Sequence, residues 1–129
     1  MLDARSIREV FARYAACLGD GDVPGIVALF SPLGVLEDPI GVCYRGPEQI
    51  AEFFRSSLHQ VGGSIRFVAE GQVRISGRHA ACAFTAICAS SSEPFEVDTL
   101  DMATFDEHGL IISMVAIWGP ENVRALGPI

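Results

Sequence analysis

The chain has 129 residues, half of them hydrophobic, and its 16 acidic side chains outnumber its nine basic ones. That size and apolar share suffice for one globular domain over residues 1–129 without disulfide bonds to stabilise it. The formal net charge of -7 repels phosphate backbones and anionic lipids, so neither nucleic acid nor a membrane is expected as a partner. No apolar run approaches the roughly 20 residues of a membrane span, and residues 1–6 open with charges, which predicts a cytoplasmic protein.

The first half of the chain is expected to form three helices. Apolar residues at helical spacing predict the first over about residues 4–18, with Gly19 as its C-terminal stop. Asp22 can cap a second, short helix, which must end before Pro32 because proline cannot continue it. A Gly-Pro-Glu sequence opens a third helix, and a Gly-Gly pair ends it, within residues 46–63.

The remaining sequence is typical of a sheet. Residues 34–38 are expected to be extended, because the residue before a proline avoids the helical region. Five later runs read as strands separated by turn-forming residues, at 64–70, 73–76, 80–89, 95–105 and 110–118. The tail, 119–129, is expected to be irregular. Helices followed by an antiparallel meander indicate the α+β class.

The residue types argue against several chemistries. All nine basic residues are arginine, so no lysine can form a Schiff base or hold pyridoxal phosphate. The nucleophile motif GxSxG, the P-loop and the GxGxxG fingerprint are missing. The histidines lie near predicted element ends without ligand spacing, and the cysteines read as reduced, mostly buried thiols, so no metal site is expected. These residues are His59, His79 and His108, and Cys17, Cys43, Cys82 and Cys88.

Asp101 is a carboxylate on the apolar side of the predicted strand 95–105. Strand alternation places it on the same face as Phe95, Val97 and Phe105. An unpaired buried carboxylate is very costly when ionised, and the group usually becomes neutral instead. Two interpretations follow: an arginine pairs with Asp101, or Asp101 is a protonated acid that donates a hydrogen bond.

Two further polar residues lie on predicted apolar faces. Tyr14 is on the inward face of the first helix, where a buried phenol normally finds a hydrogen-bond partner. Asp38 ends the extended segment 34–38, on the side of Leu36, directly before Pro39. Each also has a purely structural interpretation, as a core tyrosine and as a turn-initiating Asp-Pro.

Five stretches in chain order resemble the bacterial ketosteroid isomerases, also called steroid Δ-isomerases. They are FARY at 11–14, EDPIG at 37–41, GPEQIAEFFR at 46–55, DMATFDEHG at 101–109 and VAIW at 115–118. The EDP sequence with the following helix is shared by relatives of different function, so the joint presence of Tyr14 and Asp101 is the discriminating part. The resemblance implies a cone-shaped α+β fold like that of nuclear transport factor 2, with three helices closing a curved sheet around an apolar pocket. It also implies a homodimer formed through the open face of the sheet.

The resemblance further implies an activity and its residues. A β,γ-unsaturated ketosteroid would be isomerised through a dienolate without a cofactor, with Asp38 as the general base. Tyr14 and neutral Asp101 would donate hydrogen bonds to the oxyanion, and this family is a known case of a carboxylic acid held neutral in an apolar site. The positions that match the substrate pocket, with plain core packing as the alternative, are Phe84, Val97, Ala116 and Trp118.

The chain departs from the family where supporting tyrosines often stand on the second and third helices. The matching positions are Phe30 and Phe54, which favours a weaker isomerase or a different substrate. Two other functions remain open on the same scaffold. One is an epoxide hydrolase or polyketide-type cyclase that uses Asp38 and Asp101 as a carboxylate pair. The other is a non-catalytic binder of apolar small molecules.

Overall fold

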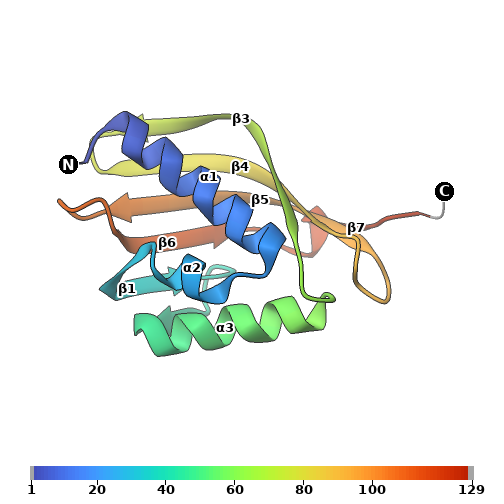
Figure 1. The fold of residues 1–129 in the computed structure, drawn as a ribbon. Helices are drawn as coiled ribbons and strands as arrows, with labels where there is room; N and C mark the ends of the chain where they lie inside the picture. Colours follow the sequence, from blue (N-terminus) through green and yellow to red (C-terminus); the bar gives the residue numbers. More distant parts are fainter. Residues whose placement is uncertain (1, 128–129) are drawn as a thin grey trace.

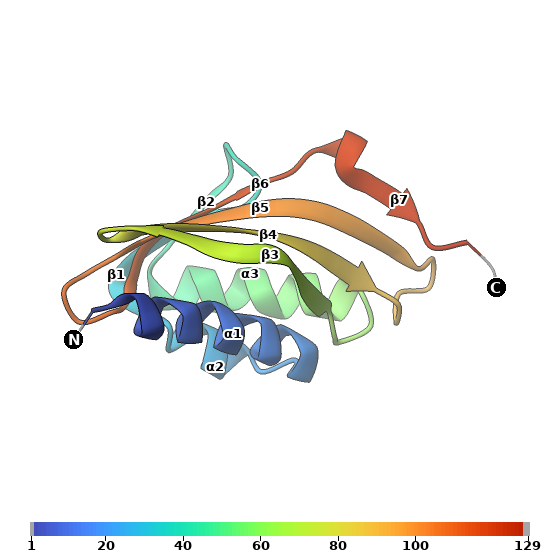
Figure 2. The same ribbon diagram turned by 90° about the horizontal axis from the view of Figure 1, so that it is seen from above.

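Three helices lie on the same side of a curved seven-stranded sheet in the computed structural model, which describes residues 2–127 (Figures 1 and 2). The helices are α1 (Ala4–Asp20), α2 (Val23–Val27) and α3 (Gly46–Gln60). The strands are β1 (Phe30–Glu37), β2 (Cys43–Arg45), β3 (Arg66–Ser76), β4 (His79–Cys88), β5 (Phe95–Phe105), β6 (Ile111–Ile117) and β7 (Val123–Ala125).

The sheet follows the order β2-β1-β6-β5-β4-β3, and β7 also pairs with β5. The strand pairs are antiparallel except β1 with β6, which is parallel. The predicted α+β class, with three helices packed on a curved and mostly antiparallel sheet, is confirmed.

Helix α1 begins and ends through local hydrogen bonds. The Asp3 carboxylate accepts from the Ser6 backbone N–H at 2.8 Å, which caps the first turn. One face of the helix is buried, at Ile7, Phe11, Tyr14 and Leu18. The helix runs two residues past the predicted stop at residue 18, because Gly21 rather than Gly19 takes the left-handed conformation, with φ 67°, that ends it.

The second predicted helix is shorter than expected. Asp22 caps α2 by accepting from the Gly25 N–H at 2.9 Å, but the helix ends at Val27. Phe30 then starts β1, four residues before the predicted extended segment, because it pairs with Ile111 of β6. Pro32 lies within β1 where the register shifts, a position at which a missing N–H is tolerated.

Two further strand predictions are corrected by the sheet. Residues 64–70 and 73–76 were expected as separate strands, but they belong to the single strand β3, whose register shifts between Glu70 and Arg74. The tail was expected to be irregular, yet a 3-10 turn, η1 (Pro120–Asn122), leads into β7. β7 forms because Val123 to Ala125 find partners on the first residues of β5.

The core lies between the helices and the concave face of the sheet. Phe11 of α1 packs on Phe84 and Phe105, with ring centroids 6.2 and 6.4 Å apart. The opposite face of the sheet exposes apolar side chains, among them Leu100 and Met102. The homodimer expected through that face remains a prediction. No helix within residues 2–127 is both long enough and apolar enough to cross a membrane.

Replacement of Gly62 by Ala should destabilise the fold more than replacement of Gly63 by Ala. Both glycines have positive φ, 89° and 97°, so both substitutions share the backbone strain. A Cβ on residue 62 would overlap the carbonyl oxygen of Ser90, whereas a Cβ on residue 63 meets no atom within 4 Å. We expect the free energy of unfolding, measured by urea denaturation, to fall about 1–3 kcal/mol further in Gly62→Ala. Equal losses in the two variants would contradict the close approach to Ser90.

Candidate active site

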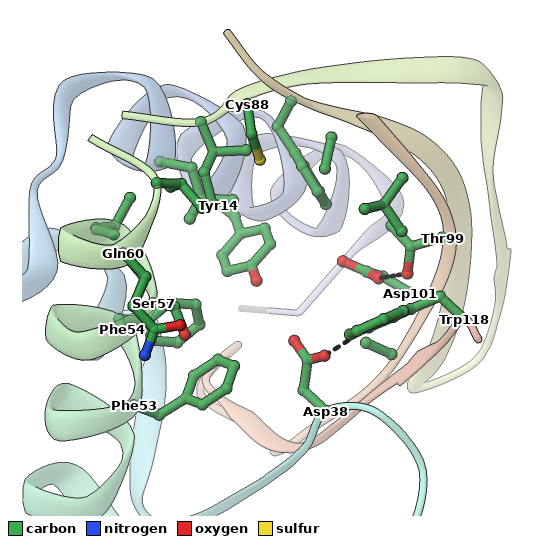
Figure 3. A pocket seen from close by; sticks show the side chains of 18 of the residues that line it. Tyr14, Asp38, Phe53, Phe54, Ser57, Gln60, Cys88, Thr99, Asp101 and Trp118 are labelled. Carbon is green, nitrogen blue, oxygen red and sulfur yellow. Dashed lines mark hydrogen bonds between the residues drawn. The ribbon is translucent and has the colours of Figure 1, made fainter. Parts of the chain in front are cut away.

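An apolar cavity of about 220 Å³ lies between the helices and the concave face of the sheet. Tyr14, Asp38 and Asp101, the three catalytic candidates from the sequence, all line it. They come from α1, from the residue after β1 and from β5. Figure 3 shows the phenol oxygen and both carboxyl groups pointing toward the same space.

Tyr14 enters the cavity from the buried face of α1 with 3% of its surface exposed. Its ring meets Phe54 and Phe67 edge-on, at centroid distances of 6.0 and 5.5 Å. Within residues 2–127 its hydroxyl has no hydrogen-bond partner. Burial, and then the charges of Asp101 and Asp38, raise the pKa of the phenol well above its usual value. Tyr14 is therefore a protonated group with a donor free for a ligand.

Asp38 follows β1 and is half-buried. The indole Nε1 of Trp118 donates to its Oδ1 at 2.8 Å. Burial raises the pKa of Asp38 to about 6, and the Trp118 hydrogen bond opposes that rise. The bond fixes one carboxylate oxygen and leaves Oδ2 available to accept a proton.

Asp101 is 2% exposed and lies on β5 between Cys82 of β4 and Ala116 of β6. Thr99 donates from Oγ1 to its Oδ1 at 3.0 Å. Burial raises the pKa of Asp101 to about 7; the Thr99 hydrogen bond lowers it, and the charge of Asp38 raises it again. With Oδ1 occupied by Thr99, a proton on Oδ2 can be donated into the cavity.

No arginine pairs with Asp101 in the described part of the chain. The arginine-pair interpretation of the sequence is therefore wrong there. Asp98, on the outward face of the same strand, shows the contrast. Arg124 of β7 holds the Asp98 carboxylate through bonds of 2.6 and 3.0 Å, and this pairing lowers the pKa of Asp98. Strand alternation places these two aspartates on opposite faces of the sheet, so Asp98 pairs with an arginine while Asp101 is buried without one among residues 2–127.

The predicted pocket residues divide into two groups. Val97, Ala116 and Trp118 line the cavity. Phe84 does not line it, because its ring stacks on Phe67 at 4.2 Å and is covered by Phe11 of α1. Phe84 faces the helices as strand alternation predicts, but α1 crosses that part of the sheet, and the cavity begins further along β4, at Ala86.

Several functional candidates were missed in the sequence. Thr99 carried a usable signal, since it is two residues from Asp101 and so shares its strand face. The Trp118 bond to Asp38 had no local signal, because 80 residues separate the partners. On α3, Ser57 and Gln60 also line the cavity. No three His, Cys, Asp or Glu side chains within residues 2–127 form a group that could hold a metal ion.

The arrangement suits acid–base chemistry on a ligand oxygen and a neighbouring atom. Tyr14 and protonated Asp101 can both donate to one oxygen on which negative charge develops. Asp38 faces the same space and can take or return a proton there. The remaining cavity wall is mostly apolar, which strengthens each of these interactions by excluding water.

Comparisons with known proteins match nearly the whole chain. Residues 11–114 match the family described as SnoaL-like domain. The steroid Delta-isomerase of Nocardioides simplex is 34% identical over 118 residues, which cover 91% of this chain and 93% of that protein. A solved structure of SalBIII, described as an epoxide hydrolase/cyclase-like enzyme in pyran ring formation in polyether salinomycin, has a TM-score of 0.86 at 24% identity. It covers 98% of this chain and 100% of SalBIII, and at that identity it shows a shared fold alone.

Replacement of Asp101 by Asn should make stability less dependent on pH. The pKa of this carboxyl is 3.8 unperturbed and about 7 in the folded chain, so the folded state keeps a proton that the unfolded state loses. The contribution of this carboxyl to the free energy of unfolding is therefore greatest below about pH 4 and falls as the pH rises toward 7. Over that window the wild type should lose on the order of 4 kcal/mol relative to Asp101→Asn, measured as the free energy of urea unfolding.

The matched control is Asp98→Asn on the outward face of the same strand. Its pKa is lowered from 3.8, so it is ionised throughout the upper part of this window, and the variant should keep the wild-type pH dependence between about pH 5 and 7. A wild-type slope in Asp101→Asn would mean that Asp101 is ionised in the folded chain.

Proposed function

The chain belongs to the SnoaL-like domain family, and from that premise we propose that it is a cofactor-free steroid Δ-isomerase. It converts Δ5-3-ketosteroids to the conjugated Δ4-3-ketosteroids by moving one proton within the substrate. The observation that carries the proposal is the convergence of Tyr14, Asp38 and Asp101 on one space in an apolar cavity. The similarity to the Nocardioides simplex steroid Delta-isomerase supports the choice of substrate class.

Asp38 serves as the base in this reaction. With a pKa of about 6, it is mostly ionised at neutral pH and still basic enough to accept a carbon-bound proton from a substrate whose enolate is stabilised. Oδ2 removes the proton from the carbon between the ketone and the double bond, and electrons shift to form the dienolate. The same carboxyl then returns the proton to the γ carbon, so atoms and charge balance and the base is regenerated.

Tyr14 and Asp101 stabilise the dienolate oxygen. Between about pH 6 and 7 Asp38 is mostly ionised while Asp101, with a pKa of about 7, is mostly protonated, and Tyr14 is protonated because its pKa lies well above its usual value. The ketone oxygen accepts from the Tyr14 hydroxyl and from Oδ2–H of Asp101, and both bonds strengthen as charge moves onto the oxygen. Preorganised donors of this kind each contribute about 10²–10³ in rate.

The two other functions make different demands on these residues. In an epoxide hydrolase or cyclase, Asp38 and Asp101 would be the acid–base pair, and Tyr14 would have no required role. In a non-catalytic binder, Asp38 would be unnecessary, because a carboxylate in an apolar cavity opposes apolar binding. The isomerase is favoured because it gives all three polar groups a task.

Replacement of Asp38 by Asn should abolish most turnover while keeping ligand binding. We expect the conversion of 5-androstene-3,17-dione, followed by the absorbance of the conjugated enone, to fall by about 10²–10⁴-fold. Equilenin, a phenolic steroid, should still bind, because both donors remain. Asp98→Asn on the outward sheet face is the control and should keep wild-type turnover. Wild-type protein that gives no rate above buffer would exclude the isomerase.

Replacement of Asp101 by Asn should leave more activity than replacement by Leu. The amide of Asp101→Asn can still donate a hydrogen bond, although more weakly than an acid, whereas Asp101→Leu removes the donor and leaves an apolar group. We expect a further loss of about tenfold or more in kcat in the leucine variant. Equal kcat values in the two variants, each shown to be folded, would contradict a donor role for Asp101.

A further inference from the structure

Polar side chains that have no role in the proposed mechanism lie at the boundary between two adjoining hollows of the protein. The cavity around Tyr14 and Asp101 has a volume of about 220 Å³, and a second hollow of about 720 Å³ adjoins it between α3 and the segment after Asp38. Pockets for drug-sized ligands usually measure about 300–1,000 Å³. A four-ring ligand with its reacting end in the smaller cavity is larger than that cavity, and this boundary, which begins at Asp38, offers it room to continue.

Five residues line both hollows, namely Asp38, Phe53, Ser57, Gln60 and Trp118. Asp38 and Trp118 are bonded to each other, and Phe53 is apolar. Ser57 and Gln60 are the polar boundary residues that the proposed mechanism does not use.

Ser57 and Gln60 share one face of α3, three residues apart, and lie across the cavity from Asp101 (Figure 3). Phe54, which meets the Tyr14 ring edge-on, marks the reacting end of the same helix. Along the helix axis Ser57 lies roughly 4.5 Å and Gln60 roughly 9 Å beyond Phe54. Both side chains therefore lie along the path of a ligand that extends along α3 away from Tyr14, with Gln60 the more remote of the two.

Both side chains have hydrogen-bonding capacity left for a ligand. Ser57 is half-buried, and its hydroxyl has no partner within residues 2–127. Gln60 donates from Nε2 to Ser56 Oγ at 3.2 Å, which leaves its carbonyl oxygen open among the same residues. Neighbouring cavity walls at this end are apolar, including Leu58, Val61, Ile65 and Phe95.

We propose that Ser57 and Gln60 determine specificity by hydrogen-bonding an oxygen substituent at the end of the substrate remote from the reacting ketone. This inference rests on the proposed function and narrows its substrate class to ketosteroids that carry a hydroxyl or carbonyl group there. The physical reason is desolvation. A ligand without that oxygen covers the Ser57 hydroxyl and displaces its water without replacing the bond, so it binds less well.

The test compares two substrates with the same reacting half, 5-androstene-3,17-dione and 5-androsten-3-one, which lacks the 17-oxygen. The wild type should prefer the dione by about tenfold in kcat/KM, which corresponds to one hydrogen bond. In Ser57→Ala, and further in Ser57→Ala with Gln60→Ala, this preference should fall toward one. The change should appear mainly in KM, because a remote contact is made equally in the ground and transition states.

His59→Ala is the matched control. His59 is exposed on α3 and lines neither hollow, so the variant should keep the wild-type preference. If the serine and glutamine variants lower kcat/KM for both substrates by the same factor, the two residues have only a structural role and the inference is wrong.

A binding measurement separates failure of this inference from failure of the proposed function. If the wild type converts neither ketosteroid, the isomerase proposal fails. Fluorescence titration with equilenin and its 17-deoxy analogue then tests whether Ser57 and Gln60 recognise the remote oxygen. If the wild type binds equilenin more tightly than the analogue and Ser57→Ala loses this difference, the proposed role of Ser57 and Gln60 is supported. Equal affinity for the two ligands in the wild type would overturn it.

Discussion

Two carboxyl groups share one apolar cavity, and no cation pairs with either among residues 2–127. Burial raises both pKa values, to about 6 for Asp38 and about 7 for Asp101, and the charge of Asp38 contributes to the higher value. Once one carboxyl is ionised, the second resists ionisation. Asp38 is less buried and accepts from Trp118, so it loses its proton first. The constraint therefore assigns the roles, because the ionised group can act as a base while the neutral one can donate.

A gap between two strands that pair with the same edge of β5 places Trp118 beside Asp38. β6 pairs with residues 100–105 of β5, and β7 pairs with Phe95 to Val97, so Asp98 and Thr99 face the gap between them. Trp118 lies at the start of this gap, outside both strands, and its indole reaches Asp38. Pairing with β5 resumes at β7, where Arg124 binds Glu96 and Asp98. These exposed ion pairs stabilise the chain only modestly, but they lie where the pairing with β5 resumes.

Sequence periodicity was sufficient to predict which face of a helix or strand is buried. It located the buried side of α1 with Tyr14, and it placed Asp101 on the inner face of β5, whose predicted and observed limits agree. It could not show which part of that face a helix covers, and this is why Phe84 lies in the core and Val97 in the cavity. Likewise β7 and the Trp118–Asp38 bond depend on partners far away in the chain, for which the local sequence has no pattern.

The surroundings of Tyr14 and Asp101 give the two proposed oxyanion donors different acidities. Phe54, a position at which the resemblance implies a supporting tyrosine, meets the Tyr14 ring edge-on, and the Tyr14 hydroxyl receives no hydrogen bond within residues 2–127. Apolar burial and two nearby carboxyls keep the pKa of this phenol well above its usual value, which makes it a weaker donor. The same apolar surroundings raise the pKa of Asp101 only to about 7, so it remains the stronger acid of the pair. In the proposed reaction the neutral aspartic acid is therefore the more acidic of the two donors to the dienolate oxygen.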